Sequence, residues 1–206
     1  MPLENIAIPL ALGTFVLFLV LLPLLRQRAR TGRWAVVVRE TSTSAESLVR
    51  WWTVGLLVAI AAWTVLLTTH GAVGLGVWEV PAVSAVIGCC LLVLGSLVVA
   101  IAQAQMGHSW RIGIDDEPTE LVTTGLFRWV RHPIYSGILA LLLGLTLITP
   151  SPWSVGGFAM GLLLVDLQAR FEEEHMRGLH EEQFAAWASS VGRFVPLVGR
   201  LRGQGA

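Results

Sequence analysis

Five apolar runs, each near the length needed to cross a bilayer, constrain this chain more than any other feature. A transmembrane helix needs roughly 20 predominantly apolar residues. Charged residues make up only 14% of the sequence, whereas a typical soluble domain has about a quarter. The sequence therefore predicts an all-α integral membrane protein with about five transmembrane helices. The predicted spans are Ile6–Leu25, Trp51–Thr69, Val80–Ala102, Ile134–Ile148 and Trp153–Leu167.

The distribution of arginines between these spans predicts the orientation of the chain. Arginines concentrate in Gln27–Arg50, in Gln103–Arg131 and after Leu167, whereas His70–Glu79 contains no lysine or arginine. Because cytoplasmic loops carry the excess of basic residues, we expect the N-terminus outside and the C-terminus in the cytoplasm. The first run lacks the basic start of a signal peptide, so we expect a retained helix. The expected location is a prokaryotic inner (plasma) membrane.

The last two spans are short, at about 15 residues each, and Thr149–Pro152 between them predicts a tight turn. We expect a short helical hairpin whose second arm continues as a helix into the amphipathic tail Gln168–Val191. This pattern predicts a three-helix N-terminal membrane region, residues 1–104, and a catalytic region, residues 105–206.

Several classes of function are disfavoured by the sequence. The formal net charge is zero, so we expect no nucleic-acid partner. Cys89 and Cys90 are adjacent and form neither a disulfide framework nor a CxxC site. His108, His175 and His180 lack the spacing of metal ligands, and no metal site is expected. The expected partners are membrane lipids and a lipophilic small-molecule or lipid substrate.

Polar residues gather at one end of the predicted hairpin. Pro133 suits the first turn of a helix, and the free N–H groups of that turn attract negative groups. His132 and Tyr135 lie about one turn apart and share a face. Arg170 and Glu172–Glu174 follow the fifth span on the same predicted side. Arginines and aromatics also occur as plain interfacial anchors, but the hairpin would bring both groups together, which predicts a site.

The role of some residues stays open at this point. Gly137 and Gly144 leave room either for a ligand or for a neighbouring helix. Gly95 and the residues beside it would pack either within the chain or between chains, so the oligomeric state is not predicted. Asp166, the acidic residue of the fifth span, either faces a cavity or reaches the membrane interface.

Two motifs resemble a known family. The first is Leu121-Val122-x-x-Gly125-x-Phe127-x-x-x-Arg131-His132-Pro133-x-Tyr135-x-Gly137, and the second joins Glu172-Glu173, Met176, Phe184, Trp187 and Arg193-Phe194-x-Pro196. In this order, with one hairpin between them, they are similar to the core and tail motifs of the isoprenylcysteine carboxyl methyltransferase family. The resemblance runs from about Gly107 to Pro196, and the first three spans match in hydrophobicity alone.

The resemblance implies a membrane enzyme that transfers a methyl group from S-adenosylmethionine to a lipophilic acceptor, such as an isoprenylcysteine-like carboxylate. It implies a cofactor pocket at the cytoplasmic end of the last two spans, capped by an amphipathic C-terminal helix. The implied cofactor-binding residues are Glu120, Leu121, Val122, Phe127, His132, Pro133, Ile134, Tyr135, Glu172 and Glu173.

The sequence departs from the family pattern at several positions. His180-Glu181 stands where the family has phenylalanine-glycine, and Phe184 and Trp187 replace two tyrosines. Gln168 falls where the family has its substrate-facing arginine, and Arg170 would take that role. Gln168 and Arg170 are therefore the implied catalytic residues. Arg170 would hold a carboxylate acceptor by paired hydrogen bonds.

Three other functions remain open. In the first alternative the protein is still a methyltransferase, but the acceptor is an amine, a thiol or a phospholipid headgroup, as in related membrane methyltransferases. Sterol reductases that use NADPH share a similar C-terminal pattern and form a second alternative. A membrane scaffold or small transporter is the third, and it would show no saturable cofactor binding.

Overall fold

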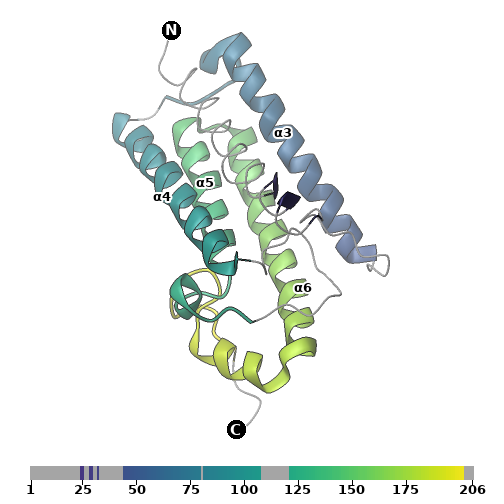
Figure 1. The fold of residues 1–206 in the computed structure, drawn as a ribbon. Helices are drawn as coiled ribbons and strands as arrows, with labels where there is room; N and C mark the ends of the chain where they lie inside the picture. The colour runs from purple at the N-terminus through teal and green to yellow at the C-terminus, as the bar shows by residue number, and fades with distance from the viewer. Residues whose placement is uncertain are drawn as a thin grey trace.

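Helices dominate the part of the chain that the structure describes. The computed structural model describes residues 44–79, 81–107 and 121–201, together with 24–25, 28–29 and 32. The labelled helices are α3 (Ser44–Gly74), α4 (Ala82–Met106), the short 3-10 helix η3 (Gly125–Arg128), α5 (Pro133–Ile148) and α6 (Pro152–Ser190). In Figure 1, α4, α5 and α6 lie side by side and α3 runs along α6. The all-α prediction is confirmed for these residues.

The apolar helices agree with the predicted spans in place but differ at their ends. Within the described residues, α3 and α4 are long and apolar enough to cross a membrane, and α5 is a shorter apolar helix. Its 16 residues reach about 24 Å, short of the roughly 30 Å of a bilayer core. Apart from its last two residues, the predicted span Ile6–Leu25 lies outside the described residues. The number of five spans stays a prediction.

The start predicted for the second span was wrong by seven residues. The predicted span begins at Trp51, whereas α3 begins at Ser44 and continues to Gly74. Glu46 lies in its first turn, where a negative charge favours the helix dipole, and no proline precedes it to mark a boundary. The predicted division between residues 104 and 105 falls within α4, whose main partner is α5.

Close contact of α4 and α5 depends on glycines spaced seven residues apart. A Cβ atom at Gly95 would lie 2.7 Å from the carbonyl oxygen of Gly137, and a Cβ at Gly88 would lie 2.8 Å from that of Gly144. These pairings make the two helices antiparallel, and the missing side chains let their backbones touch. Gly137 and Gly144 were expected to leave room for a ligand or for a neighbouring helix, and the structure supports the neighbouring helix. Gly95 packs within the chain.

Alanine at Gly95 is therefore expected to destabilise the helix pair. The added methyl group meets backbone atoms of α5, which cannot rotate away, and overpacking of this kind costs about 1–3 kcal/mol. The measurement is thermal unfolding in detergent. Gly156→Ala is the matched control, because nothing lies within 4 Å of a Cβ there, and it should unfold no earlier than the parent protein. Equal unfolding temperatures for both variants would contradict the close packing.

Prolines and serines set the ends of the hairpin. Pro133 and Pro152 open α5 and α6, at positions where a missing N–H costs nothing. Ser151 caps α6 by accepting a hydrogen bond from the Ser154 backbone, while the Ser154 side chain accepts one from the Ser151 backbone. This reciprocal capping satisfies two N–H groups that would otherwise lack partners. The tight turn predicted from Thr149–Pro152 is confirmed.

Helix α6 continues beyond the predicted span and bends near its end. The helix runs to Ser190, as predicted for the tail, but Glu181 has φ 38° and ψ −109°. Figure 1 shows the last turns leading away from the main axis of α6 at this point. The left-handed region favours glycine, so a glutamate here holds a strained backbone. Glu181 stands at the position where the related motif has glycine.

Glycine at position 181 is expected to stabilise the protein by about 1 kcal/mol, because it removes this strain. The matched control is Glu182→Gly, which places the same change one residue later in regular helix and should destabilise by about 1 kcal/mol. Thermal unfolding in detergent measures both. A loss of stability in both variants would show that residue 181 has ordinary helical geometry.

Candidate functional site

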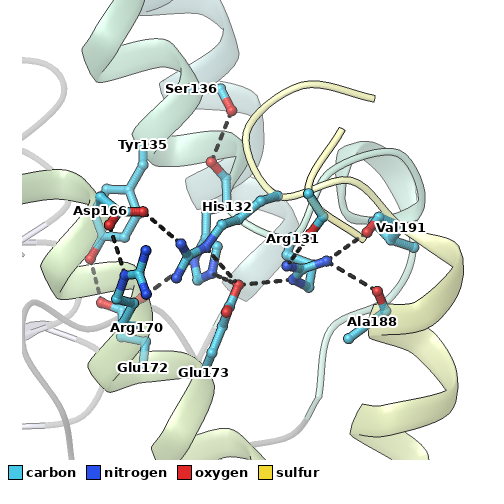
Figure 2. A network of polar contacts seen from close by, with 12 residues as sticks. Arg131, His132, Tyr135, Ser136, Asp166, Arg170, Glu172, Glu173, Ala188 and Val191 are labelled. Atoms are coloured by element: carbon cyan, nitrogen blue, oxygen red, sulfur yellow. Dashed lines mark hydrogen bonds and ion pairs between the residues drawn. The ribbon is translucent and has the colours of Figure 1, made fainter. Parts of the chain in front are cut away.

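Arg131 is a buried arginine that joins the start of α5 to the end of α6. Its side chain is 1% exposed. One guanidinium nitrogen, Nη1, donates to the carbonyl oxygens of Ala188 at 3.1 Å and Val191 at 2.6 Å, and Nη2 donates to that of Gly199 at 2.8 Å. The carbonyls of Ala188 and Val191 lie at the C-terminal end of α6, where a positive charge is favoured, and that of Gly199 lies in the segment that follows. Arg131 therefore fixes the C-terminal segment against the motif that opens α5 (Figure 2).

Glu173 accepts three of the hydrogen bonds at the centre of this arrangement. Its Oε1 atom lies 2.9 Å from Nε of Arg131, 3.1 Å from Nε2 of His132 and 3.0 Å from Nε of Arg193. The Glu173 side chain is 8% exposed. A buried carboxylate needs such partners because desolvation alone would penalise its charge. One oxygen of Glu173 is thus committed to donors within the protein.

His132 and Glu172 meet across the hairpin, as the sequence predicted. Nδ1 of His132 lies 3.5 Å from Oε2 of Glu172. The hydroxyl of Tyr135 donates a short hydrogen bond to Oε1 of Glu172, and Nε2 of Gln168 donates to the same oxygen at 3.3 Å. The rings of His132 and Tyr135 are stacked with centroids 5.5 Å apart. The polar groups of α5 and α6 therefore converge at one end of the helix pair.

The charges of His132 and Glu173 depend on each other. Burial favours the neutral form of His132, but hydrogen bonds and charge interactions with Glu172 and Glu173 outweigh it and raise the pKa of His132 above 6.5. Burial would also raise the pKa of Glu173, but His132 and Arg131 lower that pKa to about 2. The contact between His132 and Glu173 therefore favours the charged form of both side chains.

These pKa shifts predict a limited pH range of greatest stability. The raised pKa of His132 contributes stability that is present below about pH 6.5 and is lost as pH rises through the folded-state pKa. The lowered pKa of Glu173 contributes stability that is present above about pH 4.5 and is lost as pH falls towards 2. We expect thermal unfolding in detergent to occur at lower temperature at pH 9 than at pH 6. His132→Gln should reduce this alkaline loss, and an unchanged loss would assign it to other groups.

Asp166 and two arginines extend the polar contacts along α6. Oδ2 of Asp166 accepts from Nε of Arg170 at 2.8 Å, and Oδ1 accepts from Nη1 of Arg193 at 2.6 Å. Arg193 thereby connects Asp166 to Glu173. Arg170 is 65% exposed, so its ion pair is a surface contact. We call this whole set the polar network: Arg131, His132, Tyr135, Asp166, Gln168, Arg170, Glu172, Glu173 and Arg193. Figure 2 labels all of its members except Gln168 and Arg193.

The other predicted cofactor-binding residues differ in their burial. Phe127 and Pro133 are buried, and the carbonyl oxygen of Phe127 accepts from Nε1 of Trp187 at 3.1 Å. Leu121, Val122 and Ile134 are half-buried. Glu120 lies outside the described residues.

Arg131 and Arg193 were absent from the predicted site. Both belong to the quoted motifs, and both stand next to an aromatic residue that is also in those motifs, His132 and Phe194. Their place beside these aromatic residues was the signal in the sequence that could have identified both arginines as site residues. Their ion pairs with Glu173 depend on a fold-back that local sequence does not reveal.

Comparisons with known proteins found similar methyltransferases. A family model described as phospholipid methyltransferase matches residues 83–183. The protein-S-isoprenylcysteine O-methyltransferase of Saccharomyces cerevisiae is 28% identical over 117 residues, which cover 55% of this chain and 49% of that protein. Protein-S-isoprenylcysteine O-methyltransferase B of Arabidopsis thaliana is 28% identical over 115 residues, covering 54% and 58%. The match thus spans about half the length of these curated relatives.

A solved structure shares the fold over nearly the whole chain. This structure is that of a eukaryotic intramembrane Ras methyltransferase, an isoprenylcysteine carboxyl methyltransferase, solved without a monobody. Its comparison with this chain gives a TM-score of 0.61 and 18% sequence identity. The similarity covers 96% of this chain and 69% of that one. As the two motifs indicated, the chain is thus similar in sequence to isoprenylcysteine methyltransferases over about half of its length, and it shares its fold with a solved isoprenylcysteine carboxyl methyltransferase.

Proposed function

We propose that the chain is a membrane-embedded methyltransferase that uses S-adenosylmethionine and acts on a lipophilic acceptor with an isoprenylcysteine-like carboxylate. The main support is the 3.5 Å approach of His132 to Glu172, which joins the two motifs across the hairpin. The similar proteins carry methyltransferase names, which favours this function over a nicotinamide-dependent reductase.

The exposed part of the polar network suits a charged, hydroxyl-rich cofactor. Glu172 is 29% exposed, and Tyr135 and Gln168 hold one of its oxygens. A carboxylate fixed in this way can accept hydrogen bonds from hydroxyl or ammonium groups of a ligand. Bound there, S-adenosylmethionine would supply a methyl group on a positively charged sulfur. Ile134, which is half-buried in the first turn of α5, would contribute apolar surface to the cofactor site.

Arg170 is the residue we assign to a carboxylate acceptor. Its guanidinium group is exposed, and its Nε atom is bonded to Asp166. Asp166 would hold the arginine in place while its remaining N–H groups bind the acceptor. The protein would need no general base, since a carboxylate is already deprotonated.

The membrane context of the proposal rests on the arginine distribution. We infer an N-terminus outside, a C-terminus in the cytoplasm and a prokaryotic inner membrane. The polar network would then face the cytosol, where a polar cofactor is available, and the apolar helices would admit the acceptor from the bilayer. In this proposal residues 105–206 form the catalytic region, with the end of α6 capping its cofactor pocket.

Ligand-induced thermal shifts in detergent test the cofactor assignment. A ligand that binds the folded protein raises its unfolding temperature, so we expect a shift with S-adenosylmethionine and none with NADPH. The reverse pattern would support the reductase alternative. The purified protein is then incubated with membrane extract and a labelled methyl donor. A labelled ester that is released by mild base supports a carboxylate acceptor, whereas a labelled phospholipid would replace it with a headgroup amine.

A further inference from the structure

An exposed apolar surface with arginines at its edges lies beside the polar network. Its four large apolar side chains are between 56% and 68% exposed, although each lies in a well-packed turn or loop. We call it the C-terminal apolar patch, and it consists of Trp129, Val195, Leu197 and Val198 with Arg128 and Arg200 at its edges.

Two distant segments of the chain form this patch. Val130 pairs with Gly192 in a parallel bridge, and the Arg193 backbone N–H donates to the carbonyl oxygen of Val198 at 2.7 Å. Figure 1 shows the yellow C-terminal segment next to η3, below the end of α4. The exposed side chains are therefore held in one region by backbone contacts.

Leu197 is presented to the outside by a strained backbone. The Val198 N–H donates to the carbonyl oxygen of Val195 at 3.1 Å, which closes a four-residue turn with Pro196 and Leu197 at its centre. Leu197 has φ 70°, a conformation that usually requires glycine at this place in a turn. A leucine here costs stability and exposes apolar surface to water, so folding alone does not account for it.

The charges near the patch favour a negatively charged surface. Residues 121–137 and 191–206 contain no aspartate or glutamate. The guanidinium group of Arg128 lies over the ring of Trp129, 5.2 Å from its centroid. Tryptophan, aliphatic residues and arginine together are typical of protein segments in the headgroup region of a bilayer.

The patch also lies at the level where apolar helices end. Trp129 is four residues before the start of α5, and η3 is fixed to the end of α4 by a 2.8 Å hydrogen bond from the Leu126 N–H to Oε1 of Gln105. Because α4 is apolar enough to span a membrane, its end marks the approximate bilayer boundary. The patch therefore lies near the end of an apolar helix that is long enough to span a membrane.

We propose that the C-terminal apolar patch inserts into the headgroup region of an anionic lipid bilayer. Its apolar side chains enter the boundary between headgroups and acyl chains, and Arg128 and Arg200 contact lipid phosphates. This contact fixes the height of the polar network relative to the bilayer.

Spin-label accessibility measures the depth of the patch. The full chain, with Cys89→Ala and Cys90→Ala to remove other labelling sites, carries a nitroxide at Leu197→Cys or at Glu182→Cys, an exposed control position on α6. The measured quantity is the ratio of a label's accessibility to oxygen over its accessibility to a water-soluble nickel chelate. In phosphatidylcholine–phosphatidylglycerol nanodiscs this ratio should be several-fold higher for the label at 197 than for the label at 182. Arg128→Gln with Arg200→Gln, or phosphatidylcholine alone, should reduce this ratio.

Three results would overturn the proposal. A label at 197 as accessible to the nickel chelate as the label at 182 would place the patch in water. A label accessible to neither reagent would show that protein, from this chain or a second copy, covers the patch. If the label at 197 were equally deep in phosphatidylcholine alone, the arginines would not bind anionic lipid as proposed.

A second variant tests the same proposal without a label. Leu197→Gly relieves the backbone strain and should raise the unfolding temperature in detergent, because no protein contact is lost. A lower unfolding temperature would show that Leu197 packs against protein.

Discussion

Replacing Arg131 by alanine is expected to destabilise the protein by about 3–5 kcal/mol, the usual cost of leaving a buried charge without its partner. The variant loses the 2.9 Å ion pair with Glu173 and three hydrogen bonds to carbonyl oxygens at the end of α6 and beyond it. We expect the last turns of α6 and the following segment to detach from α5. Thermal unfolding in detergent, together with protease sensitivity after Ser190, measures the effect.

The control for this prediction is Arg170→Ala. Arg170 also forms an ion pair with a carboxylate, but its side chain is 65% exposed, so its loss should hardly change the unfolding temperature. Arg131→Lys keeps the charge but loses the forked geometry of the guanidinium group. Its unfolding temperature should lie between those of Arg131→Ala and Arg170→Ala. Similar stability of the Arg131→Ala and Arg170→Ala variants would mean that Arg131 is not buried in the folded protein.

Alanine at Glu172 is expected to weaken binding of S-adenosylmethionine by about 10- to 100-fold. A hydrogen bond to a charged group contributes about 1.5–3 kcal/mol, and about 1.4 kcal/mol corresponds to a factor of ten. Calorimetric titration of the purified protein measures the affinity. Unchanged affinity would remove Glu172 from the cofactor site and leave it as a partner of His132 and Tyr135.

Two variants separate binding from folding in this experiment. Glu174→Ala removes a neighbouring exposed carboxylate and should bind the cofactor like the parent protein. Arg170→Ala should retain cofactor affinity and lower turnover, because we assign Arg170 to the acceptor. If Glu172→Ala also lowered the unfolding temperature strongly, Glu172→Gln would test the charge while keeping a hydrogen-bonding group.

Local chemistry in the sequence predicted some boundaries well and others poorly. Pro133 opened a helix as expected, because proline fixes a suitable backbone angle and has no N–H to satisfy. Pro152, which was expected in the turn, opens α6 for the same reason. The start of α3 at Ser44 had no such marker and was predicted seven residues too late. The bend at Glu181 could not be predicted from intrinsic preference, since glutamate is a good helix former.

Long-range contacts account for what the sequence could not predict. The motifs predicted that His132 and Glu172 would meet, and the structure confirms it. Gly137 and Gly144 were expected to leave room either for a ligand or for a neighbouring helix, and their partner glycines on α4 became clear only in the folded chain. In the sequence Arg131 stood out only as a residue of the first motif, whereas its hydrogen-bond acceptors lie 42 to 68 residues further along the chain.

The hydrogen bond from Arg131 to Gly199 has a practical consequence for protein engineering. The Leu201 N–H likewise donates to the carbonyl oxygen of Ala188. Backbone hydrogen bonds therefore hold the C-terminal segment in place as far as Leu201. Affinity tags or fluorescent fusions joined before Leu201 would disturb the guanidinium that also holds Glu173. A fusion partner should therefore begin after Leu201, with a flexible linker, if His132 is to keep its surroundings.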